Sequence, residues 1–327
     1  TLTRPLIMRL SFYCVLEVDI EDPDEPKDPE TPHFIPAYSQ KVKASKEFQT
    51  FQFDHSFVLN SLKSSMEGYV FHNQPLDTDD LLEQTVKLFN SCKTSLELFD
   101  MLHNMRAYDD STHAHSLNVA LICRRIGKWL KVDAATLDTL TLCGLLHDIG
   151  KLKIPDEILN KPGKYTDEEF DLVKRHTKFG YELLKPLNID PHIKKAALLH
   201  HERCDGSGYP LKATQKDLDD FSMVVAIADV YDAMTAARSY RAPLCPFQVI
   251  ERFEQEGLQK YKPKFILTFL QHIASTYQNN RVLLSNGQSA NIVMLNQQHL
   301  ARPIVQLNDN SCIDLSTRLD LHIQSIL

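Results

Sequence analysis

Apolar side chains recur at steps of three and four residues through most of this chain, from about Ser45 onward. The stretch from Asp77 to Arg106 shows the spacing most clearly. Its regularly placed residues are Leu81, Leu82, Thr85, Leu88, Phe89, Cys92, Leu96, Phe99 and Leu102. Side chains at this spacing share one face of an α-helix, and Asp77 can cap the first turn. The stretch therefore predicts an amphipathic helix or a pair of helices.

The same periodicity returns in four later segments, at residues 115–130, 134–147, 166–184 and 193–202. The third segment opens with Thr166 and carries Glu169 three residues later, which is the spacing of a capping box at a helix start. Only 10 glycines occur in 327 residues, and 43% of the chain is hydrophobic, as in ordinary globular proteins. The predicted fold class is therefore mainly α.

The two ends of the chain differ from this helical middle. Residues 6–20 are rich in β-forming side chains and predict one or two strands. Residues 21–32 combine repeated prolines with acidic side chains, and this composition predicts an extended linker. After about Asn280, short apolar segments separated by turns predict a small β appendage, with Asn286-Gly287 as a hairpin turn.

Charge and composition exclude two classes of partner. The formal net charge of −7 argues against a protein that holds nucleic acid by bulk electrostatics. No stretch approaches the roughly 18 to 20 apolar residues that a membrane helix needs. The 7 cysteines are scattered and form no C-x-x-C pair, which indicates free thiols in a reducing compartment. We therefore expect a cytoplasmic protein that binds neither bulk nucleic acid nor a membrane.

The strongest local signal is the sequence His147-Asp148-Ile149-Gly150-Lys151 at the end of an apolar segment. Adjacent His and Asp side chains supply an imidazole nitrogen and a carboxylate, which borderline divalent ions such as Mn or Fe accept as ligands. A lone His-Asp pair is usually structural, because a helix histidine often has a satisfied hydrogen bond. The pair therefore indicates a metal site only if the chain contains other potential metal ligands.

Further residues of ligand type lie on separate predicted helices. They are His115, His176, His200, His201 and Asp229. Asp229 stands in an apolar segment, where burying a carboxylate is costly unless a cation or a hydrogen-bond donor offsets the cost. A bound metal ion is the simplest such cation, so the sequence predicts a metal site.

With these residues identified, the chain resembles the HD-GYP domain, a branch of the HD phosphohydrolase superfamily. The likeness runs over residues 109–241 and includes both the motif at residues 147–151 and the triplet Gly208-Tyr209-Pro210. It implies an HD-domain helical bundle with small β segments at the N- and C-terminal ends.

The likeness also suggests four parts in the chain. They are residues 1–32, a β segment and acidic linker; residues 33–106, a helical N-terminal region; residues 107–279, the HD-GYP catalytic domain; and residues 280–327, a C-terminal β-hairpin appendage.

The resemblance implies two divalent metal ions, Fe or Mn first, with other divalent ions also acceptable. One ion would lie among His115, His147, Asp148 and Asp229, and the other among Asp148, His176, His200 and His201, with Asp148 as the bridge. Some family members hold a third ion with a Glu four residues before the first ligand His. Here that position is Ser111, whose hydroxyl is a poor ligand, so we expect two ions.

The family likeness gives Asp148 and Lys151 the catalytic roles. Lys151 would contact a substrate phosphate and donate a proton to the leaving oxygen. A metal-bound histidine also needs an acceptor for its other ring nitrogen, and we expect Glu202 or Asp205 to serve. His113 and His192 are expected to be ordinary surface histidines.

Other substrate contacts follow from the same resemblance. Arg238 and Arg241 would clamp the phosphates, because a planar guanidinium binds phosphate oxygens in pairs. Gly208, Tyr209 and Pro210 would line the substrate groove or contact protein partners.

The activity implied is hydrolysis of a cyclic dinucleotide second messenger, cyclic di-GMP or 3′,3′-cyclic GMP-AMP, to the linear dinucleotide in bacterial signalling. Two alternatives stay open. One is a receptor that binds the same messenger without cleaving it. The other is an HD phosphohydrolase that acts on simple nucleotides through one metal, although the second group of histidines argues against it. The family likeness further implies a homodimer, and protein partners reached through the GYP loop or the N-terminal region.

Overall fold

A helix pair forms where the periodic stretch at residues 77–106 predicted one. The structure, a computed structural model, describes residues 38–105, 111–161, 163–236 and 244–327. The expected N-terminal strands and acidic linker, together with Arg238 and Arg241, lie outside these ranges.

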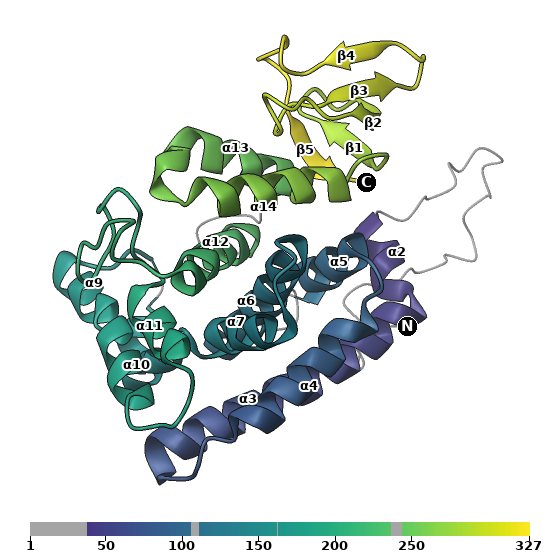
Figure 1. Cartoon of the computed structure of the whole chain (residues 1–327). Coiled ribbons are helices and arrows are strands. Elements are labelled where there is room, and N and C mark those ends of the chain that lie inside the picture. The colour runs from purple at the N-terminus through teal and green to yellow at the C-terminus, as the bar shows by residue number, and fades with distance from the viewer. Residues whose placement is uncertain (1–37, 106–110, 162, 237–243) are drawn as a thin grey trace. The chain divides into compact units, whose positions relative to one another are not determined.

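Four helices open the described chain. They are α2 (Tyr38–Ala44), α3 (Lys46–His72), α4 (Thr78–Ser91) and α5 (Ser95–Met105). Asp77 caps α4 as expected, since its carboxylate accepts hydrogen bonds from the amides of Asp79 and Asp80. The long helix α3 ends where Asn73 takes the left-handed conformation, and the chain turns back so that α4 packs against α3 (Figure 1).

The centre of the fold is built from α6 (Thr112–Trp129), α7 (Ala134–Leu146), α11 (Pro191–Leu199) and α12 (Asp220–Thr235). Most of their apolar side chains are fully buried. Helices α6 and α7 pack closely because Gly144 has no side chain: a Cβ atom there would lie 2.7 Å from the Cα atom of Ala120. This contact packs the middle of α6 against the end of α7.

A group of short helices lies between α7 and α11. It comprises the 3-10 helix η1 (Ile149–Lys153), α8 (Asp156–Leu159), α9 (Asp167–Lys174) and α10 (His176–Leu184). The predicted helix at residues 166–184 is thus two helices that meet at Arg175, and the capping box of Thr166 and Glu169 is present. A Cβ atom on Gly150 would lie 2.0 Å from the carbonyl oxygen of His176, so this glycine allows η1 to press against α10.

The C-terminal part consists of α13 (Pro246–Glu256), the 3-10 helix η2 (Leu258–Lys260), α14 (Pro263–Thr276) and an antiparallel sheet. Its strands are β1 (Arg281–Leu284), β2 (Ser289–Met294), β3 (Ile304–Leu307), β4 (Cys312–Asp314) and β5 (Ile323–Ile326), in the order β4-β3-β2-β1-β5. The hairpin at Asn286-Gly287 joins β1 to β2, with Gly287 at a φ of 83°. The small β appendage is confirmed, with β4 and β5 as strands that the sequence did not indicate.

Two expectations from composition can be compared with the described residues. None of the helices described is both long enough and apolar enough to cross a membrane. The cysteines in the same part of the chain, Cys92, Cys123, Cys143, Cys204, Cys245 and Cys312, are all free thiols.

Candidate metal centre

Seven side chains expected to bind metal come from five separate segments and meet in one place. His115 lies in the first turn of α6, Asp229 lies in α12, and His176 begins α10. His147 and Asp148 follow the last residue of α7, and His200 and His201 follow the last residue of α11. Two groups of ligand atoms result, each within 4.8 Å of one another: Asp148, His176, His200 and His201, and His115, His147 and Asp148.

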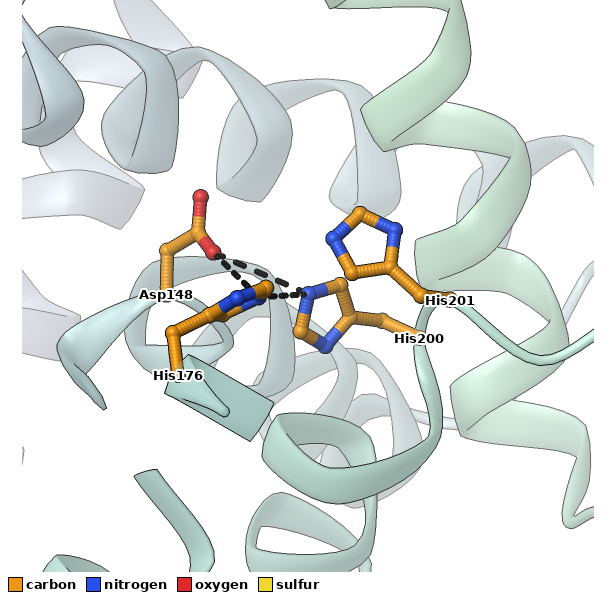
Figure 2. A group of neighbouring side chains, drawn as sticks. All are labelled: Asp148, His176, His200 and His201. Carbon is orange, nitrogen blue, oxygen red and sulfur yellow. Dashed lines mark hydrogen bonds and ion pairs between the residues drawn. The ribbon is translucent and has the colours of Figure 1, made fainter. Parts of the chain in front are cut away.

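The carboxylate of Asp148 stands between these two groups. Its Oδ1 atom lies 3.3 Å from Nε2 of His176 and 3.6 Å from Nε2 of His200 (Figure 2). Its Oδ2 atom lies 3.2 Å from Nε2 of His147 and 3.7 Å from Nε2 of His115. We call the two groups the Oδ1 side and the Oδ2 side, and include Asp229 in the Oδ2 side because its Oδ1 atom lies 3.0 Å from Nε2 of His115.

Backbone carbonyls hold three of the imidazole rings through their Nδ1 atoms. His147 Nδ1 lies 2.7 Å from the carbonyl oxygen of Gly144, and His176 Nδ1 lies 2.7 Å from that of Val173. His200 Nδ1 lies 2.9 Å from the carbonyl oxygen of Ala196. A carbonyl oxygen can only accept, so each of these Nδ1 atoms carries a proton, and any of the three rings that is neutral has a bare lone pair on Nε2.

The acceptors expected from the sequence were therefore wrong. Glu202 is buried, but its carboxylate accepts from the amides of Leu211 and Ala213 at 2.6 and 3.0 Å. Asp205 accepts from the amide and hydroxyl of Ser207. Both carboxylates therefore accept hydrogen bonds from the loop that follows His201. They do not accept one from a histidine of the centre.

His115 is held by a residue that the sequence analysis missed. Its Nδ1 atom lies 2.7 Å from Oδ2 of Asp232, one helical turn after Asp229 on the buried face of α12. Burial lowers the pKa of His115, but the hydrogen bonds to Asp229 and Asp232 outweigh it and raise the pKa to about 9. The sequence did contain a signal for this role: Asp229 and Asp232 are three residues apart in an apolar segment, so they lie on the same face of the helix.

The Oδ1 side has the opposite electrostatics. Burial is the main cause that lowers the pKa of His176 to about 3, and it also lowers the pKa of His200. Both rings are therefore neutral near pH 7, and their Nε2 atoms lie only 3.2 Å apart. With the protons on Nδ1, the two lone pairs face each other and repel, which is a favourable arrangement only around a cation.

This donor set fits a divalent metal ion. Nε2 of His147 and Oδ1 of Asp148 are buried and have no hydrogen-bond partner. Imidazole nitrogens and carboxylate oxygens are ligands that Mn, Fe and similar ions accept. The geometry supplies both kinds of atom on each side of Asp148.

Lys151 lies on η1, one turn after Asp148. Its Nζ atom is 2.5 Å from Oδ2 of Asp148. Burial raises the pKa of Asp148, but the charges of Lys151 and His147 outweigh it and hold that pKa well below its usual range. The lysine thus reaches the carboxylate that stands between the two sides.

The Gly208-Tyr209-Pro210 loop lies against the same cluster. The ring of Tyr209 is 4.7 Å from that of His201, between ring centres. A Cβ atom on Gly208 would lie 2.5 Å from the carbonyl oxygen of His201, so only glycine allows this approach. The loop therefore forms one wall beside His201.

Three other positions from the sequence analysis have a clear place. Ser111 caps α6, since its Oγ atom accepts a hydrogen bond from the amide of Ala114. His192 is partly exposed and lies 2.8 Å from Asp219, between Nδ1 and Oδ2. His113 is buried, which corrects its assignment to the surface. His113 lies in the first turn of α6, at a pocket that is also lined by residues of α3 and α8, and not on the open surface.

The comparisons with known proteins agree with this architecture. A family model described as HD domain matches residues 80–265. The 3'3'-cGAMP-specific phosphodiesterase 2 of Vibrio cholerae is 34% identical over 183 residues, which cover 55% of this chain and 35% of that protein. The cyclic di-GMP phosphodiesterase of Thermotoga maritima is 36% identical over 178 residues, which cover 54% of this chain and 48% of that protein. This chain thus spans about a third to a half of the length of these curated relatives.

A solved structure shows the same fold. Bd1817, a HDG"Y"P protein from Bdellovibrio bacteriovorus, matches with a TM-score of 0.56 and 19% sequence identity. The match covers 70% of this chain and 76% of that one.

Proposed function

The chain belongs to the HD domain family, in its HD-GYP branch, and on this premise we propose that it is a metal-dependent phosphodiesterase for cyclic dinucleotides. The substrate would be cyclic di-GMP or 3′,3′-cyclic GMP-AMP, and the product the linear dinucleotide. One observation carries the proposal: two neutral imidazoles turn bare nitrogens toward each other, 3.2 Å apart, beside the buried carboxylate of Asp148. A cation bound between the two nitrogens would remove their repulsion, and this supports the proposal.

The relatives support the substrate class. Both proteins named above carry names that state cyclic dinucleotide cleavage, one for 3'3'-cGAMP and one for cyclic di-GMP. The two names differ in the second base, so they leave the base preference of this chain open between guanine and adenine.

We propose that the Oδ1 side and the Oδ2 side each hold one divalent ion, Fe or Mn, with Asp148 shared between them. His201 completes the Oδ1 side and Asp229 completes the Oδ2 side. Bound ions of this kind lower the pKa of a water molecule and neutralise charge that develops on phosphate oxygens.

Lys151 is the proposed proton donor. Its ammonium group lies 2.5 Å from Asp148, so a phosphate placed at the centre would lie within its reach. In the overall reaction, the oxygen of one water bonds to phosphorus and one P–O ester bond breaks. The leaving oxygen takes a proton from Lys151, and the proton released by the water restores the ammonium group through solvent.

The remaining contacts belong to the same proposal. Arg238 and Arg241 would bind substrate phosphates, and Tyr209 would close the groove beside His201. A homodimer, protein partners at the Gly208-Tyr209-Pro210 loop and a bacterial cytoplasmic setting are also proposed.

The test uses the whole chain, purified without oxygen in the presence of Mn or Fe. Metal content is counted, and the products of both cyclic dinucleotides are separated by chromatography. The Asp148→Ala variant should lose turnover and most bound metal, because both sides lose their shared ligand. The Asp171→Ala variant removes an exposed carboxylate on α9 and should retain both properties.

Two results would count against the proposal. Full activity of the Asp148→Ala variant would show that Asp148 is not the shared ligand of the centre. Tight binding of a cyclic dinucleotide by the metal-loaded wild type, with no cleavage over hours, would favour a receptor instead.

A further inference from the structure

A pocket of about 580 Å³ lies beside Lys151, and one of its walls is helix α3. Lys151 links this pocket to the metal centre, because the same side chain lies 2.5 Å from Asp148. The volume is within the range of roughly 300 to 1,000 Å³ found for small-molecule sites. The pocket is therefore adjacent to the proposed reaction centre and large enough for part of a dinucleotide.

We propose that one face of α3 binds a nucleotide of the substrate and favours guanine as its base. The face consists of Lys63, Glu67 and Phe71, which all line the pocket. These residues are spaced four apart, so they lie above one another on the helix. This inference rests on the proposed function and adds a binding site for guanine, which both candidate substrates contain.

Helix α3 lies outside the region that the HD domain model matches. The helix ends at His72, whereas the match begins at residue 80. This wall therefore lies outside the matched residues, and residues beside a reaction centre but outside a shared domain are suited to setting specificity.

Two contacts fix α3 relative to the metal centre. Nζ of Lys153, on η1, lies 3.4 Å from the carbonyl oxygen of Val70 and 5.5 Å from the centre of the Phe71 ring. The hydroxyl of Tyr69 donates a hydrogen bond of 2.5 Å to the carbonyl oxygen of Leu183 on α10. The elements that carry Lys151 and His176 therefore also hold the end of α3 that bears Glu67 and Phe71.

The three side chains match the three parts of a guanine nucleotide. Phe71 is 54% exposed although it is large and apolar, and an exposed ring in a pocket can stack on a base. The carboxylate of Glu67 can accept from N1–H and the N2 amino group of guanine. Adenine has an acceptor at N1 and no amino group at C2, so it lacks this pattern. Lys63 provides an ammonium group for a phosphate.

The charges in the pocket also favour a ligand that carries N–H donors. Asp156 and Glu157 line the pocket together with Glu67, so its carboxylates outnumber its lysines, Lys63 and Lys151. A ligand that consists of phosphate alone would be repelled by this set. A guanine nucleotide offers N–H groups to the carboxylates and phosphates to the lysines.

The experiment measures cyclic di-GMP turnover and inhibition by cyclic di-AMP with the metal-loaded whole chain. The Glu67→Gln variant should narrow the preference for cyclic di-GMP over cyclic di-AMP by about tenfold, because an amide accepts only one of the two guanine protons and opposes the other with its NH₂ group. The Phe71→Ala variant should weaken binding of both molecules by about tenfold through loss of stacking.

The matched control is Phe57→Ala. Phe57 also lies on α3 and is 63% exposed, but it does not line the pocket, so its removal should leave both measurements unchanged. Thermal unfolding of each variant checks that α3 remains folded. If Glu67→Gln and Phe71→Ala behave like Phe57→Ala, α3 is no part of the substrate site.

Failure of this inference can be told apart from failure of the proposed function. A wild type that cleaves cyclic dinucleotides, with variants that match it, removes only the role of α3. If the wild type cleaves no cyclic dinucleotide, the proposed function is wrong. Equilibrium binding of cyclic di-GMP to the same variants then tests the α3 face alone.

Discussion

The two sides of Asp148 use the same kinds of side chain in different protonation states. On the Oδ1 side, His176 and His200 are buried, held by carbonyl oxygens and neutral. On the Oδ2 side, His115 lies between the carboxylates of Asp229 and Asp232, which raise its pKa to about 9. The comparison teaches that burial keeps a histidine of this centre neutral, as at His176 and His200, unless hydrogen bonds to two carboxylates outweigh it, as at His115.

The largest expected effect separates the two sides directly. His176→Ala removes a ligand from the Oδ1 side only, and His115→Ala removes one from the Oδ2 side only. If the wild type binds two ions as proposed, each variant should bind one, and each should lose nearly all turnover because both ions would act on one phosphate. Metal analysis after gel filtration measures the ratio; loss of both ions in either variant would show that the sides do not bind independently.

A second pair of variants moves the backbone of one side at a time. Gly150→Ala forces η1 away from α10, since its Cβ atom would lie 2.0 Å from a backbone oxygen. Gly144→Ala forces α7 away from α6, with a Cβ contact of 2.7 Å to backbone. Overpacking of this kind costs about 1–3 kcal/mol or more. Urea unfolding should show a loss of stability in both variants, whereas metal titration should show weaker binding mainly on the affected side.

Asp232→Asn tests how the Oδ2 side is oriented. Asparagine keeps the shape of the side chain but weakens the hold on Nδ1 of His115, so metal affinity on this side should fall by about 10- to 100-fold. Titration against a competing chelator measures it. An unchanged metal affinity would show that Asp232 does not orient the metal ligand His115. The Asp171→Ala variant is the control.

The smallest effect concerns a buried carboxylate away from the centre. Asp100 accepts a hydrogen bond from the Tyr38 hydroxyl, and burial raises its pKa to about 6, above the ordinary value of 3.8. A raised carboxyl pKa means that the folded state binds the proton more tightly. This stabilisation is therefore full below about pH 4 and is lost as the pH rises through about 6.

The magnitude of this effect is on the order of 3 kcal/mol. Asp100→Asn should remove this part of the pH dependence, as urea midpoints of both proteins between pH 4 and pH 7 would reveal. Identical pH profiles for the two proteins would contradict the shift. By contrast, Asp148 is also buried, and there the charges of Lys151 and His147 reverse the direction.

Much of the fold could be predicted because it depends on local patterns. The helix caps at Asp77 and Thr166 and the hairpin at Asn286-Gly287 are fixed by a few adjacent residues. The break at Arg175 was not predicted; it stands next to His176, whose backbone packs against Gly150 of η1, and such a contact between separate segments leaves no periodic signal. Strand β5 was missed because pairing with the distant β1 defines it, whereas β4 has only three residues and forms a local hairpin with β3.

The structure brings together the side chains that the sequence proposed as ligands, whereas the groups that hold these side chains in place were missed. His and Asp residues in several predicted helices were visible as a set, and the family likeness assigned them to one centre. Their hydrogen-bond partners were assigned to nearby acidic residues, Glu202 and Asp205. The structure instead uses main-chain carbonyls, which every sequence contains and which therefore give no signal.

Because main-chain carbonyls hold the rings, the centre should be sensitive to insertions in the helices that carry these carbonyls. Gly144, Val173 and Ala196 each lie within the last four residues of a helix, where carbonyl groups are not fully used by helical hydrogen bonds. Each ring is thus aimed by the end of the helix before it, and one inserted residue within that helix would rotate the ring by about 100°. Insertions should be tolerated in the connecting loops and rejected inside α7, α9 and α11.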